Sequence, residues 1–597
     1  MRLRKLTIRN YRGIKNCDWD LEANFVALVG PGDSTKTTLL DALGLVLTSR
    51  YNVTFTDADF YSCDAGTPII IEAVVVDLPT ALIEERAHGK NRSGIHADGT
   101  LEHDPIEADD VVECLILRLT VDATLEPIWE VVRPGEADGD RITAAQRGQL
   151  GFFRIGDFVD QHLRWGRGSA LSNLTASKTD VSHAVVEAQR QARAAISGLS
   201  GTPLHAAATF AQEEIKKLGS GPFGDLRPGL DPAFGAGSSA LVLHDGNIPL
   251  TQFGLGSRRL LSLSIQENAL AGNSIVAIDE VESGLDPHRL SNLVRYLRER
   301  TDKGELQVLL TTHSALVVES LTHGQLFVVR SKAGTTTVTG VPPALEPAAA
   351  DVLQGVMRER PSALLAQRVV VGEGATEVGF FRQLFHEWDE RATGLTELTS
   401  VTAGAALTNG SGDSHAPRRA AALANLGYPT LLVIDGDVVT NEELINTAKA
   451  AGVKVVQWPL GCALEDVLMA ELDVSGLHAV LELAIDEKSE ESVLGSIGAH
   501  LGQTIGDLEV GQLFTAFGES EVRTAIAKAA KGAKINGEKQ DGKAWFKRED
   551  RGEQLAAVVS KHSAGLTGDV LKAGVQTVKE FVYGPDIVGS VPVNEEE

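Results

Sequence analysis

Cysteine is scarce and scattered in this chain of 597 residues. The four cysteines lie far apart, and no pair has the spacing of zinc ligands or of a disulfide framework; they are Cys17, Cys63, Cys114 and Cys462. This spacing argues against a zinc module and makes a reducing cytosol the expected environment. Long apolar runs are also lacking, because no uncharged stretch approaches the roughly 18 residues that span a bilayer.

The N-terminus lacks the features of a signal peptide. The segment Met1–Ile8 largely alternates between apolar and polar residues and is typical of a strand. We therefore expect a cytoplasmic protein that does not enter a membrane.

Basic residues are outnumbered, 55 against 81 acidic ones, so the net charge is −26. A field of this sign repels a polyanion, and binding to nucleic acid then needs local basic patches or bridging metal ions. A solvated lysine-rich surface is the alternative interpretation of the one candidate patch. That patch contains Lys528, Lys531, Lys534, Lys539, Lys543, Lys547, Arg548 and Arg551.

The length predicts three to five domains or lobes. Within the first 250 residues, the sequence pattern changes from β-rich to helical at about Gly156. Apolar and β-branched runs predict two strands around a turn within 1–30, the second ending in the apolar run Phe25–Val29, and further strands at 69–76 and 112–121, with a helix from Lys36 to about Leu47. Ala-rich segments with helical spacing at 181–196 and 205–218 then indicate a helical insertion. A loop at 219–239 and a hairpin with Asp245-Gly246 at its turn follow.

The rest of the chain alternates strands with helices, which predicts an α/β fold. Strands are expected at 274–279, 307–312, 324–330, 368–372, 430–434 and 453–457, and helices at 258–270, 287–302, 376–387 and 440–451. Pro342 to Pro361 is predicted to be a junction, 475–530 is mostly helical, and the acidic tail at 594–597 is expected to be disordered.

A glycine-rich loop follows the apolar run Phe25–Val29 and opens the helix at Lys36, the setting that a phosphate loop requires. Lys36 is expected to reach the β- and γ-phosphates and Thr37 to bind Mg²⁺. Thr35 replaces the usual glycine, so its side chain is expected to crowd the phosphate. An ordinary turn is the alternative for this loop alone. The candidate nucleotide contacts here are Gly30, Gly32, Ser34, Thr35, Lys36, Thr37 and Thr38.

Four further motifs follow in order and favour an ATPase over a chance loop. The apolar run 275–278 ends in Asp279 and Glu280, which are expected to hold Mg²⁺ and to polarise the attacking water. The segment 283–287 is typical of a D-loop, and His313 follows a strand as a switch histidine does. Upstream, 253–260 has the form of a signature loop, with Gly256 and Ser257 as nucleotide contacts.

This motif order, and the opening segment 6–14, resemble the ABC-type ATPase heads of the SMC, RecF and OLD (overcoming lysogenisation defect) group. The resemblance implies ATP sandwiched between two protomers, and hence a homodimer or a higher even oligomer. The closest candidate for a Q-loop is Asp57–Phe60.

A second constellation consists of acids that follow two strands. Glu373 lies between two glycines after the run 368–372, and Asp435 and Asp437 follow the run 431–434. Parallel strands that end at one sheet edge bring such acids together, and Glu377 lies one helical turn after Glu373. Carboxylates of this kind hold Mg²⁺ against a phosphodiester. A simple turn is the alternative for 435–437 taken alone.

This second unit resembles a Toprim domain. A topoisomerase also needs a tyrosine on a DNA-binding module, and a primase or a recombination mediator usually carries zinc-binding cysteines; neither feature is found. An ABC head followed by Toprim resembles the OLD family, including the nuclease subunit of Gabija-type phage defence, over nearly the whole chain.

The OLD resemblance implies one more acid and a lysine. Glu465 is the candidate for the acid, with Asp466 second, and Lys547 is the candidate for the lysine, with Lys543 as the alternative. The implied catalytic set is Glu373, Asp435, Asp437, Lys547 and, for ATP, Glu280. The implied ligands of two Mg²⁺ or Mn²⁺ ions are Glu373, Glu377, Asp435, Asp437 and Glu465.

The sequence therefore predicts an α/β protein with an ABC-type ATPase head, a helical dimerisation insertion and a Toprim domain that has its own helical insertion. The expected parts are an N-terminal lobe at 1–155, the first insertion at 156–220, a C-terminal lobe at 221–345 and the Toprim domain at 365–597, with its insertion at about 475–530. The expected function is ATP-regulated, metal-dependent DNA cleavage; the OLD resemblance implies a role in anti-phage defence, with DNA and a defence-system protein as partners. The alternative is a RecF- or SMC-like repair ATPase whose Toprim domain is not catalytic.

Overall fold

The computed structural model describes most of the chain. The described residues are 1–50, 53–105, 110–156, 159–161, 163, 187, 190–191, 195, 244–245, 248–269, 274–341, 347–392, 398–436, 442–505, 510–535 and 544–584. Most of the expected helical insertion lies outside them, as do the loop at 219–239, Asp437, Lys539, Lys543 and the acidic tail.

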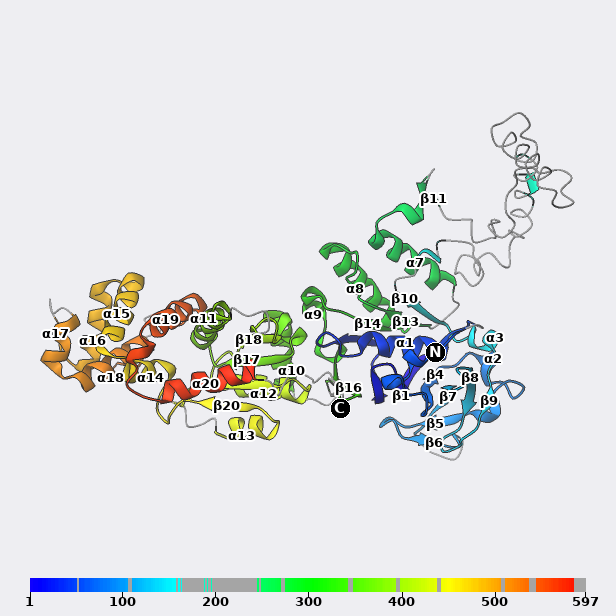
Figure 1. The fold of residues 1–597 in the computed structure, drawn as a ribbon, viewed down its shortest axis with the longest axis horizontal. Coiled ribbons are helices and arrows are strands. Elements are labelled where there is room, and N and C mark those ends of the chain that lie inside the picture. The colour runs from blue at the N-terminus through cyan, green and yellow to red at the C-terminus, as the bar shows by residue number, and fades with distance from the viewer. Residues whose placement is uncertain are drawn as a thin grey trace, which may run out of the picture. The chain divides into compact units, whose positions relative to one another are not determined.

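The chain divides into two compact units (Figure 1). The first unit contains Met1–Arg12, Asp20–Phe25 and Thr37–Thr311. The second contains Gly13–Trp19, Val26–Lys36 and Thr312–Glu597. Among the described residues, no helix combines the length and the apolar composition that a bilayer-spanning segment needs.

Antiparallel strands form one part of the first unit. β1 (Arg2–Tyr11), β4 (Ile69–Val76) and β7 (Val112–Val121) are neighbours, with Ile8 opposite Ile71 and Ile71 opposite Leu119. β4 and β7 confirm the strands expected at 69–76 and 112–121. The shorter strands of this part are β5 (Ser93–Ile95), β6 (Leu101–Glu102), β8 (Pro127–Val132) and β9 (Asp140–Arg141).

A parallel run forms the other part of the first unit, with β10 (Phe152–Ile155) and β14 (Leu306–Thr311) on either side of β13 (Ser274–Ile278). All residues of β13 and β14 are buried, as expected of parallel strands that are covered on both faces. A separate short hairpin joins β11 (His244–Asp245) to β12 (Ile248–Pro249), as the sequence predicts.

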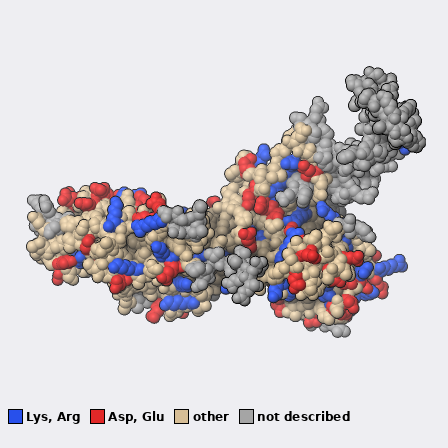
Figure 2. All heavy atoms as spheres, in the orientation of Figure 1, with Lys and Arg blue, Asp and Glu red and all other residues tan. Residues whose placement is uncertain are grey.

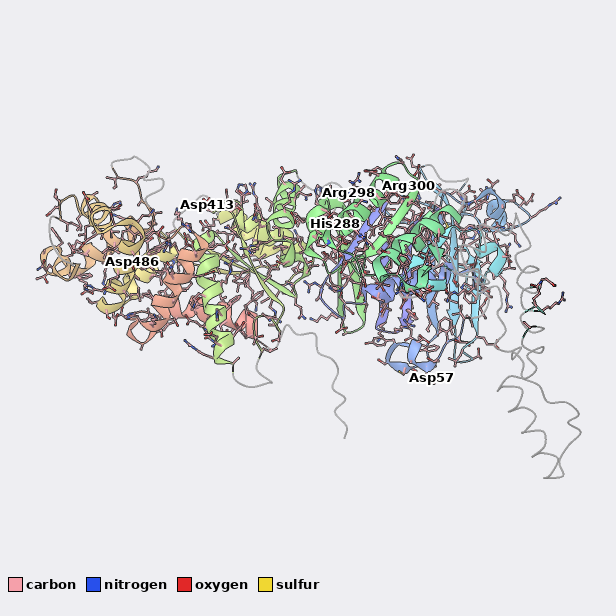
Figure 3. The ribbon with its side chains drawn as sticks, turned by 90° about the horizontal axis from the view of Figure 1, so that it is seen from above. Asp57, His288, Arg298, Arg300, Asp413 and Asp486 are labelled. Carbon is pink, nitrogen blue, oxygen red and sulfur yellow. The ribbon has the colours of Figure 1, made fainter. Side chains whose placement is uncertain are left out.

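The helices expected at 36–47, 258–270 and 287–302 are confirmed to within three residues, whereas the short helices at Thr80–Ile83 and Ala144–Arg147 were not expected. In α8 (Pro287–Asp302) the Asp286 carboxylate accepts a 3.0 Å hydrogen bond from the Arg289 amide, and Pro287 occupies the first turn. Figure 3 labels His288, Arg298 and Arg300 on this helix. The other helices are α1 (Lys36–Leu47), α2 (Thr80–Ile83), α3 (Ala144–Arg147) and α7 (Leu255–Ala269), with 3-10 turns at Asp57–Asp59, Tyr61–Cys63, Gly89–Asn91, Val159–Gln161 and Leu250–Gln252.

The second unit begins with four strands. β15 (Leu326–Lys332) pairs in parallel with β3 (Phe25–Val29) and antiparallel with β16 (Thr335–Gly340), which pairs in parallel with β2 (Ile14–Asp20). The short helix α9 (Ala315–Ser320) and a 3-10 turn at His323–Gln325 lie between the head motifs and β15.

The expected junction at 342–361 is wrong in part, because it contains the helix α10 (Pro347–Glu359). Pro347 stands in its first turn, where no amide donor is needed. Val352, Leu353, Val356 and Met357 are buried at helical spacing. The prolines at both ends obscured this periodicity. A 3-10 turn at Pro361–Leu365 follows.

A four-stranded parallel sheet comes next, in the order β18 (Ala405–Asn409), β17 (Arg368–Gly372), β19 (Thr430–Ile434) and β20 (Lys454–Gln457). The strands at 368–372 and 430–434 and their parallel pairing are confirmed. The helices of this part, drawn from green to red in Figure 1, are α11 (Ala375–Arg391), α12 (Ala416–Asn425), α13 (Glu442–Ala450), α14 (Leu464–Glu471), α15 (Val474–Lys488), α16 (Glu490–Leu501), α17 (Val510–Phe517), α18 (Glu519–Ala530), α19 (Glu549–Lys561) and α20 (Val570–Tyr583), with a 3-10 turn at Ser563–Gly565.

Helices α11 and α19 approach so closely that glycine is required at the contact. A Cβ atom at Gly379 would lie 1.9 Å from the Glu549 carbonyl oxygen, and one at Gly552 would lie 2.3 Å from the Thr376 carbonyl oxygen. Two chain segments far apart in sequence, the start of α11 and the residues before α19, are thereby held side by side.

Candidate nucleotide and metal sites

The phosphate loop folds around its own lysine. Lys36 is 6% exposed, and its Nζ donates to the Gly30 carbonyl at 3.1 Å, the Pro31 carbonyl at 2.7 Å and the Ser34 hydroxyl at 3.1 Å. Gly30 has φ +147°, and a Cβ there would lie 2.5 Å from the Val329 carbonyl oxygen. Since charge strengthens a hydrogen bond, phosphate oxygens would be stronger partners for this ammonium than neutral carbonyls. The residues therefore suit a polyphosphate.

Thr35 adopts the backbone conformation that a glycine normally supplies. Its φ is +67°, in the left-handed region that a β-branched residue rarely enters. Its Oγ1 donates to the Ser34 carbonyl at 2.6 Å and lies 3.0 Å from the Thr336 Oγ1 on β16. Its Cγ2 would lie 3.2 Å from a Cβ at Gly13. Threonine therefore preserves the shape of the loop and ties it to β16.

Thr37 and Asp279 lie together, as the motifs predict. The Thr37 hydroxyl donates to the Asp279 carboxylate at 3.2 Å, and the Thr311 hydroxyl donates to the same oxygen at 2.7 Å. Asp279 directly follows β13, and Thr311 ends its parallel neighbour β14. A hydroxyl and a carboxylate are the protein partners of nucleotide-bound Mg²⁺ in phosphate-loop ATPases, so this pair fits that ion.

Arg154 is a residue of this region that sequence reasoning missed. Its guanidinium lies 3.2 Å from the second Asp279 oxygen and also pairs with Asp41 on α1. Arg12 bonds Asp41 at 2.6 Å and Asp59 at 3.0 Å, so four ion pairs form one chain. No motif marks Arg154, because only its place on β10, beside β13, brings it to Asp279.

The Q-loop candidate Asp57–Phe60 lies at the outer end of this chain of ion pairs, through Asp59. Asp57, labelled in Figure 3, is exposed on its 3-10 turn.

Glu280 has an exposed side chain on a constrained backbone. Its φ is +44°, its amide donates to the Thr311 hydroxyl at 2.8 Å, and its carbonyl accepts from Arg259 at 3.1 Å. Arg259 also donates to the Ser283 carbonyl at 3.2 Å. These bonds fix the turn that presents the carboxylate.

The remaining head residues also occupy turns and helix starts. Gly256 and Ser257 lie in the first turn of α7, and a Cβ at Gly256 would meet the Gly284 carbonyl oxygen at 2.1 Å. The signature-like loop therefore packs on the D-loop-like turn of the same chain. His313 is exposed just after β14, Gly32 is exposed in the phosphate loop, and Thr38 lies in the first turn of α1.

Glu373 and Asp435 meet at one edge of the parallel sheet. Gly372 is level with Val433 in the register of β17 and β19. The Asp435 amide donates to the Glu373 carboxylate at 2.8 Å. The Asp435 carboxylate in turn accepts a 3.0 Å bond from the Leu464 amide, at the start of α14. The two strand ends and the helix that carries Glu465 are thus joined.

Glu377 and Glu465 are buried beside each other, with 4% and 3% of their surfaces exposed. Burial, and next the negative charge of Glu465, raise the pKa of Glu377 to about 7, with Glu373 adding to the effect. Burial also raises the pKa of Glu465, although the charges of Lys547 and Lys531 oppose it. Two buried carboxylates that repel each other favour the approach of a cation.

The segment that carries Lys547 is anchored on both sides. The Trp545 amide donates to the Ala530 carbonyl at 2.9 Å, and the Thr376 hydroxyl donates to the Phe546 carbonyl at 3.0 Å. Thr376, which no motif marks, thereby links the residue before Glu377 to the residue before Lys547. Lys547 itself is exposed, and its charge acts on Glu465.

Asp466 has a different environment from Glu465. It accepts a 2.8 Å bond from the Ala463 amide and pairs with Lys531. Its carboxylate is engaged in holding the start of α14, which favours Glu465 over Asp466 as the fifth acid.

Glu373, Glu377, Asp435 and Glu465 form what is called here the acidic edge. In the described part of the chain this edge is not a complete metal site, because no three histidine, cysteine or acidic side chains there converge as metal ligands. Backbone amides bond one oxygen each of Glu373, Asp435 and, from Gly374 at 2.8 Å, Glu377. Asp437 lies outside the described residues. The donor set suits Mg²⁺ or Mn²⁺ chemically, and its side chains must turn to bind it.

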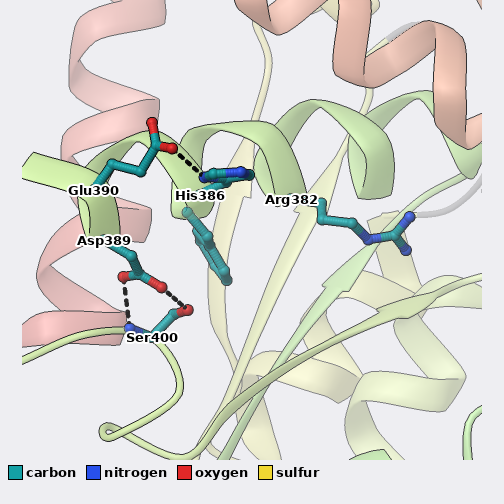
Figure 4. Close-up of a pocket in the computed structure, with 6 residues that line it drawn as sticks. Arg382, His386, Asp389, Glu390 and Ser400 are labelled. Atoms are coloured by element: carbon teal, nitrogen blue, oxygen red, sulfur yellow. Dashed lines mark hydrogen bonds and ion pairs between the residues drawn. The ribbon is translucent and has the colours of Figure 1, made fainter.

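A separate cavity of about 510 Å³ lies on the far half of α11 (Figure 4). Asp389 there binds the Ser400 amide at 2.7 Å. Asp389 is twelve residues from Glu377, or about 18 Å along a helix, so this cavity is distinct from the acidic edge. Its lining consists of Arg382, Phe385, His386, Asp389, Glu390 and Ser400.

Two family models match the first part of the chain. A model described as "AAA ATPase domain" matches residues 1–93, and one described as "AAA domain, putative AbiEii toxin, Type IV TA system" matches residues 190–319. The two matched segments are similar to AAA-type ATPase domains. The matches include the phosphate loop, Asp279, Glu280 and His313. No curated relative matches the chain.

Among solved structures, the chain is similar to SMC head domains. For the SMC head domain from Thermotoga maritima the identity is 14%, the match covers 57% of this chain and 100% of that one, and the TM-score is 0.28. A second match is the Smc head domain with an extended coiled coil bound to the C-terminal domain of ScpA, from Pyrococcus furiosus. Its identity is 14%, the match covers 59% of this chain and 99% of that one, and the TM-score is 0.34.

Proposed function

We propose that the chain is an ATP-regulated, metal-dependent DNA endonuclease of the OLD type, with a Toprim nuclease unit at 365–597, acting in phage defence as a homodimer or a higher even oligomer. The observation that carries the proposal is the junction of Glu373, Asp435 and the start of α14 by two hydrogen bonds, with buried Glu377 and Glu465 beside them. A purely structural domain has no need to bury two repelling carboxylates.

The residues of the acidic edge divide into two roles. Glu373, Glu377, Asp435, Asp437 and Glu465 would hold two divalent ions, which would supply water activation and stabilise the leaving oxygen of a phosphodiester. Lys547 would bind the scissile phosphate and offset the charge that grows on it. Its anchored backbone keeps that charge close to Glu465.

The ATPase head would control whether DNA reaches this edge. Lys36, Thr37 and Asp279 would hold the nucleotide and its Mg²⁺, and Glu280 would orient the attacking water. Gly256 and Ser257 would contact the ATP of a second protomer. Acidic and basic side chains are mixed over the face drawn in Figure 2, so DNA contacts would depend on local lysines and bound cations.

A second candidate is a RecF- or SMC-like DNA repair ATPase whose Toprim unit does not cut. Backbone amides on the carboxylates of Glu373, Asp435 and Glu377 favour it, because they show that these acids also have a structural role.

Plasmid nicking with Mg²⁺ or Mn²⁺, with and without ATP, separates the two candidates. The nuclease converts supercoiled DNA to open-circular or linear forms, and Lys547→Ala slows the conversion to a low but still measurable rate. Metal-independent DNA binding with no conversion by the wild type supports the repair ATPase instead.

A further inference from the structure

One helix end lies beside the lysine segment of the acidic edge. Arg360 directly follows α10, and its Nη2 bonds both carboxylate oxygens of Glu549, at 3.0 and 2.7 Å. Glu549 is the first residue of α19, two residues after Lys547. Arg360 therefore holds the first residue of α19 in place.

A second arginine completes this bridge from α11. Arg382, labelled in Figure 4, bonds Glu549 at 2.6 Å and Glu553 at 3.0 Å. Burial acts to raise the pKa of Glu549, but bonds from Arg382 and Arg360 outweigh it and lower that pKa. Glu549 thus stays ionised and joins α10, α11 and α19.

The residue before Arg360 reaches the opposite side of the same edge. Glu359 pairs with Arg419 at 2.7 Å, and Arg419 is buried and bonds the Asn409 carbonyl at 2.5 Å. Asn409 ends β18, level with Gly372 on β17. The last residue of α10, Glu359, is therefore linked through Arg419 to the strand end beside Glu373. The next residue, Arg360, is linked through Glu549 to the segment that carries Lys547.

The body of α10 contacts the segment that follows the switch histidine. The Gln354 side chain accepts a 3.0 Å bond from the His323 amide and donates a 2.9 Å bond to the Leu321 carbonyl. These residues lie directly after α9, which begins two residues after His313. A movement of the segment after His313 would be passed to α10.

We propose that Arg360 is a positioning residue for DNA cleavage: through Glu549 it holds Lys547 at the acidic edge, and α10 conveys the nucleotide state of the head to that lysine. The inference rests on the proposed nuclease function and adds the route of its control. Because one guanidinium nitrogen of Arg360 donates to both oxygens of Glu549, the pair fixes the orientation of the carboxylate as well as its distance, which a lone surface charge does not.

The test compares Arg360→Met with Arg358→Met, an exposed arginine on the same helix outside the bridge. We expect Arg360→Met to lower kcat for nicking about tenfold or more, with little change in KM for DNA or in the Mg²⁺ requirement. The ratio of rates with and without ATP should fall to near one. In a Lys547→Ala background, Arg360→Met should cause no further loss, because the residue it positions is absent.

Circular dichroism and thermal melting check that each variant is folded. If Arg360→Met does not fold, Arg360→Lys, which retains the charge without the planar fork, takes its place with the same expected dependence on Lys547. Additive losses from Arg360 and Lys547, or an equal loss in Arg358→Met, would overturn the inference while the nuclease function stands. A wild type that does not cut overturns both.

Discussion

The backbone amide of Asp435 donates a 2.8 Å hydrogen bond to the side chain of Glu373, although 62 residues separate the two in the chain. This bond joins the ends of β17 and β19, and it places one acid where the backbone of the other is fixed. Any loss of the Glu373 carboxylate therefore removes a candidate metal ligand and a support for the Asp435 loop at once.

Glu373→Ala is expected to lower DNA cleavage by at least about a hundredfold and to leave ATP binding intact, because the nucleotide residues lie elsewhere in the chain. Nicking assays and ATP titration measure the two effects. Glu390→Ala, at the exposed end of α11, serves as the matched control. Full nicking by Glu373→Ala with metal present would refute the site.

Removal of metal is expected to make the protein less stable as pH rises. The raised pKa values of Glu377 and Glu465 mean that the folded state holds protons which the unfolded state has released. Stability is then full below the ordinary glutamate pKa and falls as pH rises toward about 7 for Glu377. Mg²⁺ should raise the melting temperature by more at about pH 8 than at about pH 5.

Glu465→Gln provides the control for this pH effect. Without metal at about pH 8 it should melt at a temperature equal to or a few degrees above that of the wild type, and it should gain less from Mg²⁺. An equal Mg²⁺ shift at both pH values, in both proteins, would exclude these carboxylates as ligands.

The site residues that lie in local sequence motifs could be predicted from the sequence. The residues that reach the sites only through long-range contacts could not. The phosphate loop, Asp279 and Glu373 each stand beside a buried strand, so composition and position alone indicate them. Arg154, Thr376 and α10 carry no such signal. Arg154 meets Asp279 only through strand pairing.

The strand β18, which the sequence did not predict, and the contact between α11 and α19 also lack a local sequence signal. β18 has only one β-branched residue, Thr408, so its sequence does not predict a strand. The contact of α11 with α19 depends on Gly379 and Gly552, and an isolated glycine in a helix is not a specific signal of close packing.

Glu280→Gln is expected to slow ATP hydrolysis strongly and to trap a nucleotide-bound dimer. The amide bond to Thr311 would still fix the backbone, and Asp279 would still accept from Thr37, so nucleotide binding should persist. Steady-state ATPase assays and light scattering with ATP measure both outcomes. Glu299→Gln, exposed on α8, is the control; an unchanged rate in Glu280→Gln means that another group orients the water.

Thr35 sets the final prediction, because a β-branched residue there holds a φ of +67° and bonds Thr336. The left-handed conformation costs roughly 1–2 kcal/mol in a residue with a Cβ. We expect wild-type ATP turnover to be slow, below about one per second, so that nucleotide acts more as a regulatory ligand than as a fuel.

Three variants separate the effect of the strained backbone at Thr35 from the effect of its hydrogen bond to Thr336, the tether. Thr35→Gly removes both, Thr35→Ala removes the hydroxyl and the branch but keeps a Cβ at positive φ, and Thr336→Ala removes only the partner. If the tethered, strained loop limits turnover, Thr35→Gly should raise the hydrolysis rate several-fold and the other two by less. Nucleotide binding should survive in all three, since Lys36 and Thr37 are unchanged. Fast wild-type turnover, or a Thr35→Gly protein no faster than the wild type with and without DNA, would show that threonine at this position does not limit the reaction.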